Sequence, residues 1–99
     1  MYWVCILYSE SSDMFYKGQT SDLDNRLHRH NQGLEKYTKA GAPWKLLWAA
    51  NKASRSETIK LESKLKNLSR IRLIKFMLKY KENVSSPDAL LLIKQWSGC

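Results

Sequence analysis

The chain has 99 residues, of which 43% are hydrophobic and 26% are charged. This length suits one small domain with a single core, and this balance excludes a disordered, collagen-like or coiled-coil chain. Seventeen lysines and arginines oppose nine aspartates and glutamates, so the formal net charge is +8. Such a charge favours an anionic partner: nucleic acid is the first candidate, and acidic proteins or lipid headgroups are the alternatives.

The chain opens with a pattern typical of a β-hairpin. Residues 2–8 are almost all apolar, aromatic or β-branched, the polar stretch 9–13 follows, and a second strand is predicted through 16–20. Gly18 falls in the middle of the second strand. A glycine there indicates close approach of another backbone or a ligand, and a β-bulge is the alternative.

A short helix is predicted next. Ser21 begins a weak relative of the capping box, leucines follow at helical spacing, and Gly33 supplies a stop. Residues 34–43 contain lysine, glycine and proline without periodicity, which predicts a basic loop. The apolar stretch 44–50 then predicts a third strand.

The second half of the chain is predicted to be helical. Ser54 and Glu57 form a full capping box before a leucine stripe, which predicts a helix over about 55–68. Residues 71–79 are also helical in composition, and a break is expected near 67–70.

A last short helix is predicted to begin at Pro87, because Ser86 can cap it and proline is favoured at the first helical position. We expect the apolar residues of segment 87–96 to pack on the domain's own sheet, with docking on a partner as the alternative.

Cysteine usage and the start of the chain indicate a compartment. Cys5 and Cys99 lie far apart without a CxxC pattern, which argues against a disulfide framework or a zinc motif. Residues 1–8 lack the basic lead and cleavage site of a secretory signal, and no apolar run approaches the length of a membrane span. We therefore expect a cytoplasmic protein without membrane contact, in which Cys5 is a small buried hydrophobic residue.

Basic residues are concentrated in the predicted helices. Ten of the 17 lysines and arginines lie between Lys52 and Lys81, against two acidic residues, Glu57 and Glu62. A solvated helix face and a phosphate-contacting surface both explain such a run. The chain is poor in the carboxylate clusters that two-metal hydrolases need.

A looser constellation could carry chemistry: Tyr16 on a strand, Arg26 and His30 one turn apart on the following helix, and Glu62 on the capped helix. Arg26 and His30 stand at i and i+4 and therefore share a helix face. Taken singly, each residue also has an ordinary structural role, in packing, in solvation or beside a helix dipole.

At this point the sequence resembles the GIY-YIG nuclease superfamily, in particular its small single-domain bacterial members. The resemblance runs from about residue 1 to 80. It rests on the order and spacing of these segments: 16–23, Arg26 with Leu27, 30–33, 36–38, 43–46, 54–57, and Glu62 with Leu65 and Lys66. Two positions depart from the family pattern. Cys5 stands where the tyrosine of the GIY element would stand, and Lys17 replaces the isoleucine of YIG.

The resemblance implies roles for individual residues. Tyr16 corresponds to the YIG tyrosine, Arg26 to the active-site arginine, and Glu62 to the ligand of a single divalent metal, Mg²⁺ or Mn²⁺. His30 matches a histidine found in many members. Lys17, Lys39 and Lys66 are expected to contact nucleic acid.

The chemistry of these residues agrees with those roles. Glu62 would hold the ion against the scissile phosphate and Arg26 would brace that phosphate. An ordinary phenol, with a pKa of about 10, is a poor base at neutral pH. Tyr16 would therefore need positive charge from Arg26, the metal or Lys39; His30 is the alternative base.

The resemblance also implies a fold and an activity. We expect an α+β domain with a three-stranded antiparallel sheet flanked by helices in the order β-β-α-β-α-α, over residues 1–82, and an extension with a short helix over 83–99. The implied function is metal-dependent endonuclease cleavage of nucleic-acid phosphodiester bonds, with DNA favoured over RNA. The alternative is a catalytically impaired nucleic-acid-binding module of the same fold, because a thiol at Cys5 cannot reproduce the reach or hydrogen-bond geometry of a phenol.

Overall fold

The computed structural model describes residues 2–32 and 41–98, and within those ranges it contains three strands, four α-helices and one short 3-10 helix. They run in the order β1 (Tyr2–Ser9), β2 (Met14–Thr20), α1 (Leu23–Asn31), β3 (Trp44–Lys52), α2 (Arg55–Lys66), α3 (Arg70–Lys79), η2 (Lys81–Asn83) and α4 (Pro87–Trp96). This confirms the predicted α+β fold. Gly33 and most of the predicted loop 34–43 lie outside the described residues. Among the described helices, none has the length and apolar character needed to cross a membrane.

The sheet is antiparallel with the order β2-β1-β3, so β1 is its central strand. Every residue of β1 from Val4 to Ser9 is buried, because helices cover both faces of the sheet. Val4, Ile6 and Tyr8 point to one face and join the main hydrophobic core. Cys5 and Leu7 alternate to the other face. The pairing of β1 with β3 has an irregularity between Ile6 and Leu7.

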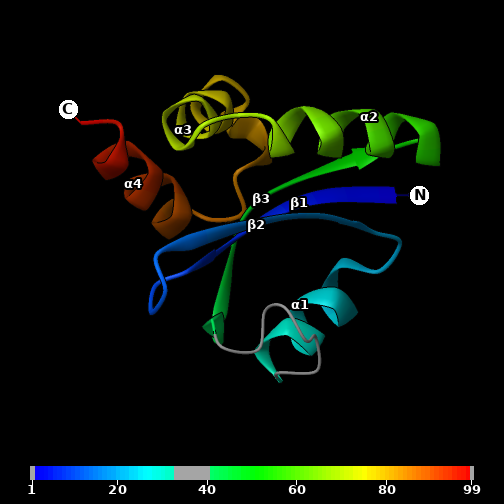
Figure 1. The fold of residues 1–99 in the computed structure, drawn as a ribbon, viewed down its shortest axis with the longest axis horizontal. Helices are drawn as coiled ribbons and strands as arrows, with labels where there is room; N and C mark the ends of the chain where they lie inside the picture. Colours follow the sequence, from blue (N-terminus) through cyan, green and yellow to red (C-terminus); the bar gives the residue numbers. More distant parts are fainter. Residues whose placement is uncertain (1, 33–40, 99) are drawn as a thin grey trace.

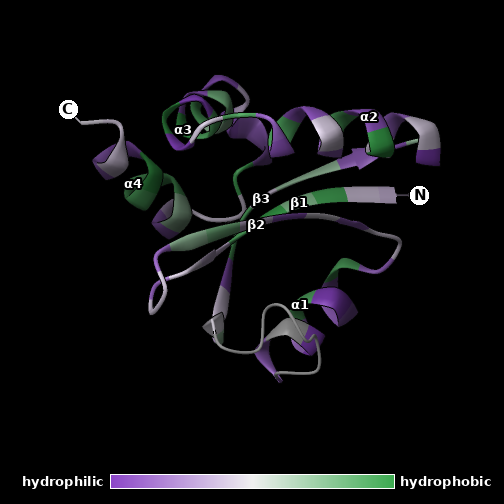
Figure 2. Ribbon diagram, in the orientation of Figure 1, coloured by the Kyte–Doolittle hydropathy of each residue, from purple (hydrophilic) through white to green (hydrophobic). Residues whose placement is uncertain are grey.

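The helices form two layers of different character. Figure 1 shows α2 and α3 on one side of the sheet and α1 on the other. In Figure 2, β1 and the inner side of α4 are mainly hydrophobic, whereas α1 is mainly hydrophilic. The larger core therefore lies between the sheet and α2, α3 and α4, where Leu65, Met77 and Ile93 are fully buried. The thinner α1 layer leaves room for polar groups on the opposite face.

Serine caps set the starts of the C-terminal helices, as predicted. Ser54 and Glu57 form both hydrogen bonds of the capping box, and Ser86 accepts from the backbone of Ala89. The break between α2 and α3 falls at 67–69, and Ser69 caps α3. The expected cap of α1 is wrong by one residue. Asp22, rather than Ser21, accepts a hydrogen bond from the backbone of Asn25, at 3.1 Å.

Helix α4 packs on the domain's own core. Ala89 and Ile93 are buried in the main cluster, and the ring of Trp96 lies edge-on to Tyr8 at 4.7 Å between centroids. This confirms that the segment folds back onto the sheet. The division of the chain at residues 82 and 83 stays a prediction.

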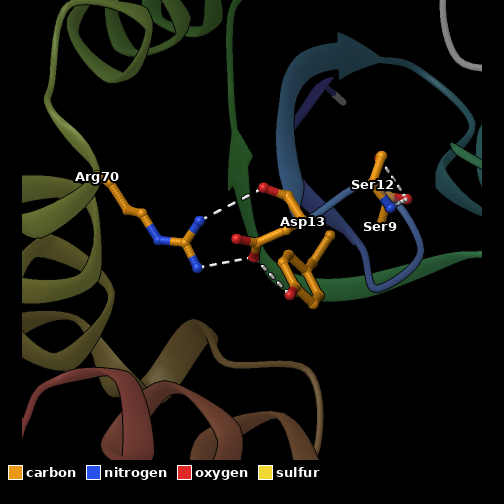
Figure 3. A network of polar contacts seen from close by, with 5 residues as sticks. Ser9, Ser12, Asp13 and Arg70 are labelled. Carbon is orange, nitrogen blue, oxygen red and sulfur yellow. Dashed lines mark hydrogen bonds and ion pairs between the residues drawn. The ribbon is translucent and has the colours of Figure 1, made fainter.

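A polar clamp joins the β1–β2 turn to α3. Figure 3 shows the guanidinium of Arg70 reaching Asp13, to which it donates at 2.9 Å, while the Tyr8 hydroxyl donates to the same carboxylate at 2.8 Å. Arg70 also lies over the rings of Phe15 and Trp96, at 5.1 and 5.8 Å. The clamp therefore connects β1, β2, α3 and α4.

We expect this clamp to make stability depend on pH in the acidic range. The hydrogen bonds from Arg70 and then from Tyr8 hold the pKa of Asp13 below its usual value of 3.8. A carboxyl group whose pKa is lower in the folded state stabilises the protein above its unfolded pKa, and that stabilisation is lost as pH falls through the folded pKa. Urea unfolding between pH 6 and pH 2 should show this loss in the wild type and a weaker pH dependence in Asp13→Asn. Glu10→Gln, which removes a carboxylate from the same turn, is the control. An unchanged pH profile in Asp13→Asn would contradict the prediction.

Candidate active site

Tyr16 and Arg26 meet on the face of the sheet that α1 covers. Thr20 and Asp22 exchange two hydrogen bonds, at 3.0 and 3.1 Å, and so fix the turn from β2 into α1. Arg26 lies one turn into α1, where its Nη2 donates to the hydroxyl oxygen of Tyr16 at 2.9 Å. Both side chains are half-buried. The structure thus brings together two residues that stand ten positions apart in the sequence.

Gly18 is required by the ring of Tyr16. A Cβ at Gly18 would lie 2.8 Å from Cε1 of that ring, which is closer than real side chains approach. Gly18 pairs regularly with Cys5, so the bulge considered from the sequence is wrong. Within the described chain the close neighbour is the Tyr16 side chain, rather than a second backbone. The glycine therefore allows the phenol to lie flat along its own strand toward Arg26.

Gly18→Ala is expected to displace the Tyr16 ring and break its hydrogen bond with Arg26. Because the ring end of a side chain can swing away, we expect the fold to persist, with a change in unfolding free energy within about 1 kcal/mol. Ring-proton chemical shifts of Tyr16 would report the displacement. In a Tyr16→Ala background the same glycine substitution should have no effect on the site, and an effect of equal size there would contradict this explanation.

Glu62 reaches the same region from the other helix layer. Thr58, fully buried on α2, donates to the side-chain oxygen of Gln19 on β2 at 3.0 Å and so holds α2 beside β2. One turn later, the Glu62 carboxylate lies 2.9 Å from the ammonium of Lys66, with side-chain exposures of 16% and 56%. That hydrogen bond raises the pKa of Lys66, and Tyr16 also contributes. The pKa of Lys66 is therefore raised by both Glu62 and Tyr16, two of the predicted site residues.

Cys5 lies between the two helix layers. Its thiol is 1% exposed and donates to the Gly18 carbonyl at 3.7 Å. Burial raises the pKa of Cys5 to about 11. The charge of Arg26 acts to lower this pKa, and the charge of Glu62 raises it by a smaller amount. The thiol is therefore protonated at neutral pH, which confirms the expectation of a buried, unreactive cysteine. Because Arg26 and Glu62 both act on this thiol, their charges come from α1 and α2 to the same part of the sheet.

The other predicted residues are placed less completely. Lys17 follows Tyr16 on β2, pairs with Ile6 and points to the opposite face, as alternation requires. His30 lies on α1, but its side chain is outside the described part of the structure. Lys39 lies outside the described residues altogether.

Trp44 is a neighbour of the site that the sequence did not single out. Its ring stands edge-on to Tyr16 at 6.3 Å between centroids, and its backbone N–H donates to Asn31 at the end of α1. Position 44 was predicted as the start of a strand and belongs to segment 43–46 of the family resemblance, but it was given no place in the site. A proline followed by an aromatic residue at the entry to β3 was the available signal, but its spacing does not reveal contact with Tyr16.

The donor set fits one hard divalent cation only in part. Among the described residues, no three histidine, cysteine, aspartate or glutamate side chains cluster as a metal site. Mg²⁺, however, commonly binds through one or two carboxylates, with water and substrate phosphate completing its shell. Glu62 suits such a site because its carboxylate is partly exposed, but Lys66 would have to release it. The chemistry is therefore compatible with a single ion that binds together with a phosphate.

The chain resembles known proteins along most of its length. Residues 1–75 match the family model of the GIY-YIG catalytic domain. A UPF0213 protein of Listeria monocytogenes is 34% identical over 74 residues, which are 74% of this chain and 83% of that protein. A UPF0213 protein of Streptococcus pneumoniae is 42% identical over 57 residues, but the match spans only 58% of its length.

A solved structure supports the same relationship. The solution structure of a UPF0213 protein from Bacillus halodurans superimposes with a TM-score of 0.51 at 31% identity, covering 82% of this chain and 86% of that one. The family match covers the strands and helices that carry Tyr16, Arg26 and Glu62. The chain belongs to the GIY-YIG superfamily, within which it is similar to the UPF0213 proteins.

Proposed function

We propose that this protein is an endonuclease that uses one divalent metal, Mg²⁺ or Mn²⁺, to hydrolyse phosphodiester bonds in nucleic acid, with DNA preferred over RNA. The observation that carries the proposal is the hydrogen bond from Arg26 to Tyr16 on the same part of the sheet to which Glu62 brings a carboxylate. A cation that can hold a phosphate thus lies beside a phenol, and Glu62 on α2 offers a potential metal ligand that acts on the same buried strand. The net charge of +8 suits a polyanionic substrate.

Each residue has a separate task in this mechanism. The guanidinium of Arg26 would brace the scissile phosphate. It lies beside the phenol oxygen of Tyr16, where it would stabilise the phenolate that accepts a proton from the attacking water. Glu62 would hold the metal once Lys66 releases the carboxylate. When bound, the ion would offset charge on the phosphate and on the leaving oxygen. Lys66, freed from Glu62, would remain close enough to contact the phosphate backbone.

A second candidate is a nucleic-acid-binding module of the same fold that has lost efficient catalysis. The observation that favours it is Cys5, which is buried and protonated, so it offers no group able to orient water at that position. This reading predicts metal-independent binding that weakens steeply with salt, without nicks.

Cleavage of supercoiled plasmid and of labelled single-stranded DNA, with and without Mg²⁺ or Mn²⁺, separates the two candidates. We expect nicks that require metal and that follow the protein peak on a sizing column. Binding at low salt without cleavage under either metal would reject the enzyme in favour of the binding module. An RNA strand of the same sequence tests the preference for DNA, and faster cleavage of the RNA would reverse it.

A further inference from the structure

A cleft of about 190 Å³ lies at the β3 edge of the sheet, on the face that α2 and α3 cover. It is bounded by β3, α2 and α3. The Tyr16 site belongs to the opposite edge, where β2 lies. The cleft is lined by aromatic, basic and polar side chains, among them Trp48, Phe76, Tyr80, Lys52, Lys64 and Asn83. Its lining has no part in the proposed reaction.

The aromatic side of the cleft is held rigidly. Trp48 is 1% exposed, and its indole N–H donates to the carbonyl of Tyr80 at 3.0 Å. The ring of Phe76 stands edge-on to Trp48 at 5.4 Å and is tilted against Tyr80 at 4.9 Å. Phe76 and Tyr80 are only half-buried, so part of each ring is open to solvent. This arrangement offers a fixed, partly exposed aromatic surface.

Two ammonium groups lie against these rings. The ammonium of Lys64 lies 5.5 Å above the ring of Phe76, and that of Lys79 lies 5.5 Å from the ring of Tyr80. Lys52 ends β3 at the rim. Within residues 2–32 and 41–98, the ion pairs of α2 and α3 are Lys66 with Glu62 and Arg70 with Asp13, and neither belongs to the cleft. The cleft therefore has cations that no neighbouring carboxylate neutralises in the described structure.

We propose that this cleft binds one unpaired nucleotide of the nucleic-acid strand, with its base against Phe76 and Tyr80 and its phosphate between Lys52 and Lys64. The proposal rests on the proposed function and narrows its substrate class to nucleic acid with a single-stranded segment. Aromatic side chains beside lysines bind single strands because every base has a face that can stack. A cleft of this size admits one base and excludes a duplex.

The position of the cleft relative to Glu62 supports this assignment. Lys64 and Leu61 of α2 face the β3 side, whereas Glu62 and Lys66 face Tyr16 on the β2 side. Neighbouring residues of α2 thus line the cleft on one side of the helix and carry the Glu62 carboxylate on the other. The cleft and the carboxylate are separated by about the width of α2. A strand that lies across α2 would be held on one side in the cleft and would present its phosphate to Glu62 on the other.

The test is binding without metal, so that cleavage plays no part. We would titrate the full chain with labelled oligothymidine of 12 nucleotides and with a blunt-ended linear duplex, over a range of salt concentrations. For Lys52→Gln/Lys64→Gln we expect a loss of about tenfold in affinity for the single strand and a salt slope lower by about 1.4, which is two contacts at 0.7 each. The control Lys75→Gln/Lys94→Gln makes the same charge change at exposed positions outside the cleft.

A second variant separates stacking from charge. Tyr80→Leu keeps the backbone carbonyl that Trp48 uses, and we expect it to lower single-strand affinity about tenfold with an unchanged salt slope. Equal losses in the cleft and control variants, or equal losses for the linear duplex and the single strand, would overturn the proposal. Wild-type affinity in all cleft variants would do the same, even if the protein cleaves DNA. Absence of cleavage with the expected binding losses would instead reject the proposed activity and leave the cleft assignment in place.

Discussion

Glu62→Gln is expected to lower metal-dependent cleavage by about a thousandfold while the protein stays folded. Glutamine keeps the size of the side chain and its place on α2, but it removes the charge that would hold a divalent ion. A metal at a scissile phosphate is worth several kcal/mol, and each 1.4 kcal/mol corresponds to about a factor of ten in rate. The measurement is the single-turnover rate with saturating Mn²⁺, beside urea unfolding of the same sample.

The matched control is Glu57→Gln, five residues earlier on the same helix. The Glu57 side chain accepts from the backbone of Ser54 in the capping box, and glutamine can make the same hydrogen bond. The two variants thus change charge equally, but Glu62 is paired with Lys66 whereas Glu57 belongs to the capping box. Cleavage at the wild-type rate in Glu62→Gln, or an equal loss in both variants, would remove Glu62 from the metal site.

Metal binding can also be measured without cleavage. In the structure Lys66 occupies the carboxylate that the ion would need. Lys66→Gln is therefore expected to tighten Mn²⁺ binding several-fold in calorimetry, whereas Glu62→Gln should weaken it. Opposite shifts from two residues one helical turn apart would not arise from a general loss of structure.

Most of the fold could be predicted from patterns of residues close together in the sequence. The capping box at Ser54 fixed the start of α2, and the serine and proline at 86 and 87 fixed that of α4, because caps and helix starts depend on residues close in sequence. The uninterrupted apolar run of β1 likewise reflected a strand buried on both faces. The same reasoning put the cap of α1 at Ser21 instead of Asp22, since either side chain could accept the hydrogen bond.

Contacts between distant segments could not be predicted in this way. Gly18 signalled close approach, but only the folded chain shows that the approaching group is the ring of Tyr16, two residues earlier on the same strand face. The clamp from Arg70 to Asp13 joins positions 57 residues apart, and Trp44 meets Tyr16 across the sheet. The family resemblance supplied Tyr16, Arg26 and Glu62 as a set. Their geometry, including the competition of Lys66 for Glu62, came from the structure.

Tyr16 and Arg26 are expected to act as a unit. Arg26→Gln should lower kcat/KM about a hundredfold or more, because it removes the positive charge that donates to the Tyr16 oxygen and withdraws a donor from the phosphate. Tyr16→Phe should cost a similar factor through loss of the hydroxyl that would activate water. Tyr2→Phe on β1 and Arg29→Gln on α1 are the matched controls, since each makes the same chemical change on an element of the site without the bond between Tyr16 and Arg26.

The double variant decides whether the 2.9 Å hydrogen bond between these side chains matters for catalysis. If Arg26 acts partly through the phenol, Tyr16→Phe/Arg26→Gln should lose far less than the product of the two single losses, because residues that act together show non-additive effects. Fully multiplicative losses would mean that Arg26 serves the phosphate alone and that Tyr16 works without it. Arg26→Lys sharpens the result: a lysine keeps the charge but lacks the planar fork that reaches both the phenol and a phosphate, so we expect it to rescue little activity. Full rescue by lysine would show that charge alone is sufficient at this position.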